Sequence, residues 1–431
     1  MNATLELLRG EPRARRFFAA YAQSALGNGA GYVALVVLAY QRWHSPWAIT
    51  LVLMADFIPA MLFGPIFGAV ADRWSRRNIA VLADLMRAAA FIAVGLVGGI
   101  WATVALALVA GTGAGLFTPA ILAALPSLVN ERRLPAATSL YGGLTDAGRM
   151  LGPALAALAM ILTSAEAVVI ANGATFLISG AVLAFTRFGG VATGLAGEDH
   201  NLFRQAREGV RAVARMRGVP TLVAASSGVI LFGAMMNVAE LLLAKSLGAG
   251  EAGYSILVAV FGAGFVVGSL SGAKGGALPE LKRRYLLGIL LIGAGLVVAA
   301  VPSFVVAALG LALSGLGNGV ALVNERLICQ RVIPDRFLGR AFAVFDTAGS
   351  WAFAIAFIGA GAVLSLAGTR PLLLAAGIGS GLIWAASRIA LRGTWDSEPA
   401  PPDVPRVAEV QLPPATAAGR TAAERVPALV E

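Results

Sequence analysis

The sequence of 431 residues has a single cysteine, Cys329, and only two histidines, His44 and His200. One thiol excludes an intrachain disulfide, and two isolated histidines give no metal-ligand spacing, so we expect no metal and no cofactor. Charged residues make up 13% of the chain, whereas a soluble globular protein has about 25%. These shortages exclude a disulfide-stabilised domain and a water-soluble enzyme.

Apolar residues are abundant instead: 58% of the chain is hydrophobic, the mean hydropathy is +0.80, and there are 52 glycines. A helix that spans a bilayer needs about 20 mostly apolar residues, and small residues such as glycine let membrane helices pack closely. The composition therefore predicts an all-α membrane protein. We predict twelve spanning helices, near residues 17–41, 47–71, 78–99, 102–125, 137–163, 165–187, 219–246, 252–273, 285–301, 303–328, 341–366 and 370–391.

Lysines and arginines accumulate in every second loop between the predicted spans. The loops in between carry only Arg42, Lys245 and Arg370. Because cytoplasmic loops hold the excess of basic residues, both termini are expected in the cytoplasm, with the protein in a bacterial inner membrane. The same distribution explains the net charge of +10, because the basic residues orient the protein in the membrane. No nucleic-acid partner is therefore expected.

The longest internal polar stretch divides the spans into two sets of six. Arginines recur in it every three or four residues from Arg204 to Arg215, which favours a short basic helix at the inner membrane surface, with a solvated linker as the alternative. The predicted organisation is a cytoplasmic N-terminal segment (1–16), a six-helix bundle (17–187), a cytoplasmic linker with this basic helix (188–218), a second six-helix bundle (219–391) and a disordered cytoplasmic tail (392–431).

The two halves share spacings of glycine. The pattern Gly64-x-x-x-Gly68 is matched 200 residues later, and Gly113-x-Gly115 is matched 204 residues later. Halves with an even number of spans have the same orientation in the membrane. The repeats therefore predict two bundles related by a pseudo-two-fold axis, with a substrate site between them near the middle of the membrane.

Residues 64–77, at the end of the second predicted span, combine glycines with one acid and three bases. Gly64 and Gly68 share a helix face and would let another backbone approach closely. One acid and three bases in a tight turn can form ion pairs that rearrange, which suits a conformational latch. Its charged residues are Asp72, Arg73, Arg76 and Arg77.

This stretch resembles the signature G-x-x-x-D-R-x-G-R-R of the major facilitator superfamily, with Ser75 in place of the usual glycine. The resemblance implies twelve transmembrane helices in two six-helix bundles that rock about a central site. It also implies that Asp72 meets the start of the eleventh span and stabilises the outward-facing state. Arg340, at the start of that span, would add a charge to this latch.

The fifth predicted span carries Gly143, Gly148, Gly152 and Pro153, which resemble the antiporter signature of the same superfamily. Short segments at 117–120, 125–129 and 137–140 resemble its branch of drug, macrolide and siderophore efflux proteins. These resemblances imply a proton antiporter that exports its solute.

Ionisable residues at membrane depth are unfavourable unless they are paired or lie in a wet cavity, so each is a functional candidate. Asp84 and Arg87, three residues apart, are expected to form a local structural pair, and Glu325 and Arg326 surface pairs. For the others, proton coupling competes with a structural role in hydrogen bonds or ion pairs. These proton-coupling candidates are Asp56, Asp146, Arg149, Glu240 and Asp346.

By resemblance, spans one, four, seven and ten line the central cavity. Polar residues follow one face of the first span, and aromatic and methionine side chains would form adaptable apolar walls. The alternative is hydrogen bonding between helices and contact with lipid. The cavity candidates are Tyr21, Ser24, Asn28, Tyr32, Phe117, Phe232, Met235, Asn237 and Asn318.

Together these features predict a secondary active transporter that exports a hydrophobic or amphipathic small molecule by proton-coupled alternating access. Its expected partners are that solute, protons and membrane lipids, and it is expected to be a monomer. A lipid or lysolipid transporter and an uptake symporter of the same fold are the alternatives. A membrane-embedded enzyme or a channel is more remote, because neither histidine lies at membrane depth and no symmetric pore motif occurs.

Overall fold

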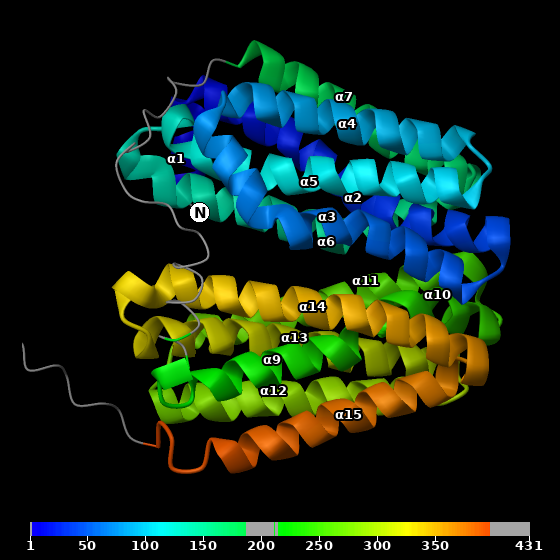
Figure 1. Ribbon diagram of the computed structural model, residues 1–431, viewed down its shortest axis with the longest axis vertical. Helices are drawn as coiled ribbons and strands as arrows, with labels where there is room; N and C mark the ends of the chain where they lie inside the picture. Colours follow the sequence, from blue (N-terminus) through cyan, green and yellow to red (C-terminus); the bar gives the residue numbers. More distant parts are fainter. Residues whose placement is uncertain (1, 187–210, 212–213, 397–431) are drawn as a thin grey trace, which may run out of the picture.

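Long α-helices packed side by side form the described part of the protein (Figure 1). The structure is a computed structural model that describes residues 2–186, 211 and 214–396. The first bundle contains six long helices: α2 (Pro12–Trp43), α3 (Pro46–Arg73), α4 (Arg76–Leu96), α5 (Ile100–Leu128), α6 (Leu134–Leu162) and α7 (Ala165–Phe185).

The second bundle repeats this arrangement, and its first span is broken at Met235 into two helices. Its helices are α9 (Val219–Ala234) and α10 (Met236–Ser246), then α11 (Gly250–Ser269), α12 (Leu278–Ala299), α13 (Phe304–Val332), α14 (Asp335–Ala367) and α15 (Thr369–Ala390).

Ten helical stretches among the described residues are long and apolar enough to cross a membrane. The remaining two long helices, α6 and α12, have 29 and 22 residues but carry more charge near or within their apolar segments. Asp146 and Arg149 lie inside α6, and three bases from Lys282 to Arg284 lie near the start of α12. With α9 and α10 counted as one span, the predicted fold of twelve membrane helices in two bundles is confirmed.

The turn between α2 and α3 illustrates how the sequence ends one helix and begins the next. His44 follows α2 in the left-handed conformation, with φ of 50°, and its N–H closes the last turn on the carbonyl oxygen of Tyr40. Ser45 then accepts a hydrogen bond from the N–H of Trp47 at 3.2 Å, and Pro46 occupies the first helical position of α3. This histidine therefore terminates a helix.

Equivalent glycines in the two bundles pack against equivalent backbone. A Cβ atom on Gly113 of α5 would lie 2.8 Å from the carbonyl oxygen of Ala83 in α4. A Cβ atom on Gly317 of α13 would lie 2.6 Å from the carbonyl oxygen of Gly288 in α12. Both glycines permit a helix contact too close for any side chain. The match at an offset of 204 residues is therefore confirmed as a structural repeat.

The predicted glycine match between α3 and α11, at an offset of 200 residues, is wrong. Gly111 of α5 packs on the backbone of Asp56 in α3, and its counterpart Gly315 of α13 packs on the backbone of Phe261 in α11. Equivalent positions in α3 and α11 are therefore 205 residues apart. In a chain with 52 glycines, a pair with x-x-x spacing recurs by chance.

The glycine pair of α3, Gly64 and Gly68, and the glycine pair of α11, Gly264 and Gly268, also have different surroundings. A Cβ atom on Gly264 would collide with the carbonyl oxygen of Ala312 in α13, whereas one on Gly64 or Gly68 would meet nothing within 4 Å. Within the part of the chain that the structure describes, the close backbone approach expected at Gly64 and Gly68 is absent. These two glycines lie in open space in the conformation described.

The two bundles meet at one end of the molecule. We call the end where α2 begins and α15 ends the terminal end, and the opposite end the far end. At the far end Gln41 of α2 donates a hydrogen bond to Glu251 of α11 at 2.7 Å, and Thr50 of α3 donates to the carbonyl oxygen of Phe357 in α14 at 3.2 Å. The Phe57 ring lies 5.8 Å from that of Phe357. Toward the terminal end the two sets of helices diverge (Figure 1).

The polar segments are described only in part. The N-terminal segment contains a short helix, α1 (Asn2–Gly10), and the following Glu11 pairs with Arg133 at 3.3 Å. Most of the predicted linker, including Arg204 and Arg207 of its basic helix, lies outside the described residues, as does the tail after residue 396. The linker helix and the disordered tail stay predictions.

The packing asymmetry between Gly264 and Gly64 predicts different responses to one added methyl group. Gly264→Ala should destabilise the contact of α11 with α13 by about 1–3 kcal/mol, because the Cβ atom overlaps a carbonyl oxygen. Gly64→Ala is the matched control and should keep the wild-type stability. The melting midpoint of the detergent-solubilised protein measures both, and equal losses would contradict this packing.

Candidate functional site

Arg87 of α4 places a positive charge in the interior of the first bundle. The residue is 9% exposed, and its guanidinium lies 3.7 Å from the carboxylate of Asp84, which is fully buried. The same guanidinium donates a hydrogen bond to the side-chain oxygen of Asn28 at 3.1 Å and lies 3.7 Å from the ring centre of Phe176 and 5.7 Å from that of Phe117. An acid, an amide and two aromatic faces thus replace water around the buried charge.

Asp56 of α3 supplies a second acid for this arginine. Its carboxylate interacts electrostatically with Arg87. The backbone of Asp56 contacts Gly111 of α5, which holds this turn of α3 against the rest of the bundle. Arg87 therefore forms the local pair with Asp84 that its spacing predicts and also has a longer-range electrostatic interaction with Asp56 of a second helix.

A polar contact joins α2 of the first bundle to α10 of the second. The hydroxyl of Tyr32 in α2 donates a hydrogen bond to the side-chain oxygen of Asn237 in α10 at 3.4 Å, and the Asn237 amide donates to the carbonyl oxygen of Ala234 at 3.0 Å. Two carboxylates interact electrostatically with Tyr32: Glu240 from the second bundle and Asp56 from the first. We call Tyr32, Asn237, Asp56 and Glu240 the interbundle bridge.

Glu240 contributes an acid from the second bundle to this bridge. It is 6% exposed and lies three residues after Asn237 in α10, so both residues share one helix face. Tyr254 of α11 is fully buried and lies within electrostatic range of Glu240, and its hydroxyl has no hydrogen-bond partner among the described residues. Proton gain or loss at Glu240 therefore changes the charge in an apolar region where few groups compensate for it.

Tyr21, Ser24 and Phe117 fill the packed interior of the first bundle. Tyr21 shares a hydrogen bond of 2.7 Å with the hydroxyl of Thr145 in α6. Its ring stacks on Tyr141 at 4.6 Å and on Phe117 at 6.2 Å between ring centres. Ser24 is buried on the same helix. These cavity candidates therefore link α2 to α5 and α6 in the conformation described.

A cavity of about 450 Å³ opens within the second bundle, among α9, α12, α13 and α14. Its lining includes Asn318 and Glu325 of α13, Asp346 of α14, and Arg326. The Glu325 carboxylate lies beside the hydroxyl of Tyr285, and Asp346 interacts electrostatically with Arg326. The expected surface location of Glu325 is wrong, because the helix turn that carries it faces this cavity.

The remaining cavity and proton-coupling candidates lie apart from the bridge. Phe232 packs on α15, and the methyl group of Met235 lies against α14, so both side chains fill the second bundle. Asp146 and Arg149 are exposed on α6, and neither forms an ion pair with another described residue. Their position beside the Gly-Pro run made these two residues candidates in the sequence. In the structure both side chains lie on the surface of α6.

The predicted latch is described only in part. Arg76 donates a hydrogen bond to the carbonyl oxygen of Ala123 in α5 at 2.5 Å, which ties the start of α4 to α5. The side chains of Asp72, Arg73 and Arg340 lie outside the described residues. The latch therefore stays a prediction.

Known proteins resemble this chain over most of its length. The sequence model of the Major Facilitator Superfamily matches residues 17–356. The chain is 24% identical over 388 residues to the uncharacterized MFS-type transporter YfiS of Bacillus subtilis, covering 86% of this chain and 91% of YfiS. It is 23% identical over 353 residues to macrolide efflux protein A of Streptococcus pyogenes, covering 79% and 86%.

Solved structures of transporters share the fold. The nucleoside transporter NupG superposes with a TM-score of 0.73 at 12% identity, covering 88% of this chain and 99% of NupG. A bacterial homologue of the lysosomal transporter Spinster, in an inward-facing and unoccupied conformation, gives a TM-score of 0.68 at 13% identity, covering 90% and 99%.

The chain belongs to the major facilitator superfamily. It is a multi-pass membrane transporter and not an enzyme, and efflux proteins are among its relatives. Within the residues that the structure describes, no group of three His, Cys, Asp or Glu side chains is placed to hold a metal ion.

The buried position of Arg87 predicts a strong dependence of stability on its charge. Arg87→Gln should lower the free energy of unfolding by about 3–5 kcal/mol, because it leaves buried carboxylates without their counter-charge. Adding Asp84→Asn to that variant should restore part of the loss. Thermal unfolding of the single and double variants in detergent measures this, and an Arg87→Gln protein as stable as wild type would contradict the buried charge cluster.

Proposed function

We propose that the protein is a secondary active exporter in a bacterial inner membrane, which uses the proton gradient to expel a hydrophobic or amphipathic small molecule. Similarity to macrolide efflux protein A supports the direction of transport and the class of solute. The interbundle bridge is the observation that carries the proposal, because it couples titratable acids to the contact between the two bundles.

The terminal end is the cytoplasmic end in this proposal. Basic residues gather in the loops of that end, which favours the cytoplasmic side. The bundles touch at the far end and diverge at the terminal end, so this conformation would be open to the cytoplasm. Alternating access then requires the far-end contacts to open as the terminal end closes.

Protonation of the bridge would bias this rocking motion. Tyr32 and Asn237 form a hydrogen bond across the bundles, and one carboxylate of each bundle interacts electrostatically with Tyr32. Arg87 interacts electrostatically with Asp56, so loss of the negative charge on Asp56 leaves Arg87 with a weaker total counter-charge, supplied by Asp84. A proton that arrives at either acid thus alters the electrostatics of both the charge cluster and the contact between bundles.

The cavity of the second bundle is the proposed entry site for the solute. Its walls combine the aromatic rings of Phe342 and Phe345 with polar groups that include Asn318 and Asp346. A few placed polar groups on a mostly apolar wall suit an amphipathic solute better than a sugar phosphate. We also propose that the transporter acts as a monomer.

Asp56→Asn tests proton coupling directly. The substitution should abolish solute accumulation driven by a pH gradient in everted membrane vesicles, because asparagine cannot exchange a proton, while the amount of protein in the membrane stays unchanged. A macrolide serves as the first solute probe. Uptake by Asp56→Asn vesicles at the wild-type rate would remove Asp56 from the coupling mechanism.

Asp396→Asn is the matched control, since this acid follows α15 on the protein surface. A hydrogen bond from Lys282 lowers the pKa of Asp396, so it stays ionised at neutral pH and takes no part in a proton cycle there. Vesicles with this variant should transport as wild type. Loss of transport in both variants would indicate a general defect and contradict a specific role for Asp56.

The predicted latch also leads to a prediction about the antibiotic resistance of cells that express the protein. In a host without its own efflux pumps, the protein should raise resistance to at least one amphipathic antibiotic, and Asp72→Asn should remove most of that gain by weakening one end state of the rocking cycle. Growth inhibition across a panel of antibiotics measures this. Full resistance with Asp72→Asn would contradict the latch.

A further inference from the structure

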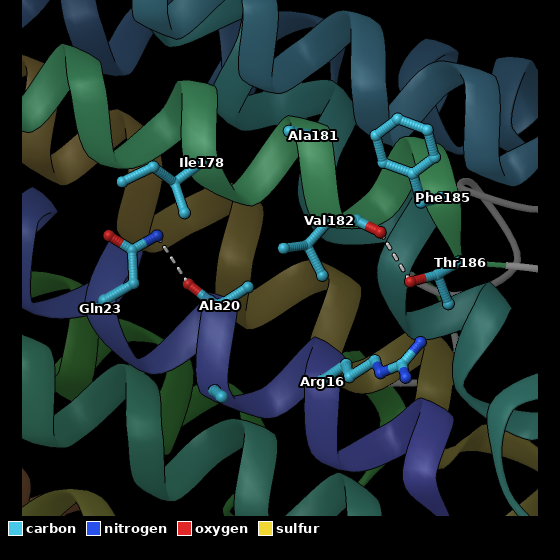
Figure 2. Close-up of a pocket in the computed structure, with 9 residues that line it drawn as sticks. Arg16, Ala20, Gln23, Ile178, Ala181, Val182, Phe185 and Thr186 are labelled. Carbon is cyan, nitrogen blue, oxygen red and sulfur yellow. Dashed lines mark hydrogen bonds between the residues drawn. The ribbon is translucent and has the colours of Figure 1, made fainter.

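A groove of about 530 Å³ lies between α2 and α7 of the first bundle, near the terminal end (Figure 2). Alanines line it on both helices, so the space between the helices is wide enough to admit an alkyl chain. Larger apolar side chains of α7 stand along it and are exposed: Phe185 is 89% exposed and Ile178 is 54% exposed. The apolar lining residues are Ala19, Ala20, Ile178, Ala181, Val182 and Phe185.

The groove faces the surroundings of the bundle. Helix α7 packs on α2, α4 and α6 of its own bundle. A solute moving through the centre of the protein would pass between the bundles. The groove is therefore separate from the cavity proposed for the solute, and its ligand comes from the membrane around the first bundle.

Most polar groups of the groove are already bonded within the protein. Gln23 donates from its amide to the carbonyl oxygens of Ala20 at 2.9 Å and Thr175 at 2.8 Å, and so fastens α2 to α7. The hydroxyl of Thr186 donates to the carbonyl oxygen of Val182 at 2.7 Å (Figure 2). A ligand in the groove thus meets apolar surface along most of its length.

Arg16 is the exception. It is exposed, lines the groove from α2, and forms no ion pair with another described residue. Figure 2 shows its side chain extending away from α2 in the direction of Thr186, the last lining residue on the α7 side. The groove therefore offers an apolar surface with one guanidinium at its terminal end that has no ion-pair partner among residues 2–186, 211 and 214–396.

We propose that this groove binds one anionic phospholipid of the cytoplasmic leaflet. An acyl chain lies between α2 and α7 along Ile178, Val182 and Phe185, and the phosphate accepts charge-assisted hydrogen bonds from Arg16. The groove is apolar along most of its length and has a cationic side chain at one end, just as a phospholipid has apolar acyl chains and an anionic head group at one end. Basic pockets between membrane helices on the cytoplasmic side recognise anionic head groups. The bound lipid fills the opening between the two helices that Gln23 fastens together.

Native mass spectrometry of the full-length protein in detergent tests this site. Phosphatidylglycerol and phosphatidylcholine with the same acyl chains are titrated separately, and occupancy of the first bound lipid is compared. Wild type should bind phosphatidylglycerol about tenfold more tightly than phosphatidylcholine, and Arg16→Gln should lose about that factor for phosphatidylglycerol. Arg16→Lys should keep part of the preference.

Two variants separate the groove from general surface charge. Arg15→Gln removes the neighbouring exposed arginine, which does not line the groove, and should bind phosphatidylglycerol as wild type does. Ala181→Phe fills the groove from an exposed position of α7 and should lower binding of the first phosphatidylglycerol while Arg16 is intact.

Four results would overturn the proposal. The first three are equal affinity of the wild type for the two lipids, wild-type binding of phosphatidylglycerol by Arg16→Gln, and wild-type binding by Ala181→Phe. Equal losses in Arg15→Gln and Arg16→Gln would do the same, because they would indicate attraction to a general basic surface. Melting midpoints of all variants, expected to equal that of wild type, establish that each is folded.

Discussion

The contact between the two bundles is the constraint on which the rest of this structure depends. Each bundle packs its own helices closely, with glycines such as Gly113 and Gly317 placing backbone against backbone. The bundles themselves touch through α3 on α14 and α6 on α11, and the contacts at Gln41 and Thr50 lie at the far end. Two rigid units joined near one end can change their relative tilt without repacking either interior. In the proposed mechanism, access to the centre depends on which end of the two bundles is joined.

Buried charge connects this mechanical arrangement to chemistry. Arg87 keeps its charge in an apolar interior because Asp84, Asn28 and aromatic faces surround it, and Asp56 adds a longer-range attraction. Asp56 is shared with the interbundle bridge, where it interacts with Tyr32. A change of charge on Asp56 thus reaches both the stability of the first bundle and its contact with the second. In the proposed mechanism, this sharing is the route by which a proton on Asp56 would act on a movement between bundles.

The sequence predicts the helices well because bilayer thickness sets their length. Runs of about 20 apolar residues must form helices in lipid, where every backbone polar group needs an internal partner. Two predicted site residues, Tyr32 and Asn237, form a hydrogen bond between the bundles, and Asp56 and Glu240 interact electrostatically with Tyr32, since polar groups in such helices turn toward one another and away from lipid. Spacing along one helix also predicts the Asp84–Arg87 pair.

Features that depend on contacts between helices could not be predicted from the sequence alone. The reach of Arg87 to Asp56 crosses from α4 to α3, and no periodicity encodes that crossing. Glycine spacing alone aligned α3 with α11 at the wrong offset. The correct offset follows from the contacts that glycines of α5 and α13 make with these two helices, and spacing along one helix does not contain those contacts. Glu325 has a base beside it in the chain, yet its helix turn faces a cavity and Tyr285.

Joining the bundles covalently at the far end tests the central claim most directly. Gln41→Cys and Glu251→Cys, in a chain with Cys329→Ala, place two thiols where a hydrogen bond of 2.7 Å now joins α2 to α11. A short thiol-specific crosslinker between them should stop transport in proteoliposomes, because the far end can no longer open. The same crosslinker between Glu11→Cys and Arg133→Cys, a pair 3.3 Å apart within the first bundle, should leave transport intact. Transport at the uncrosslinked rate with the far end joined would contradict rocking of the two bundles.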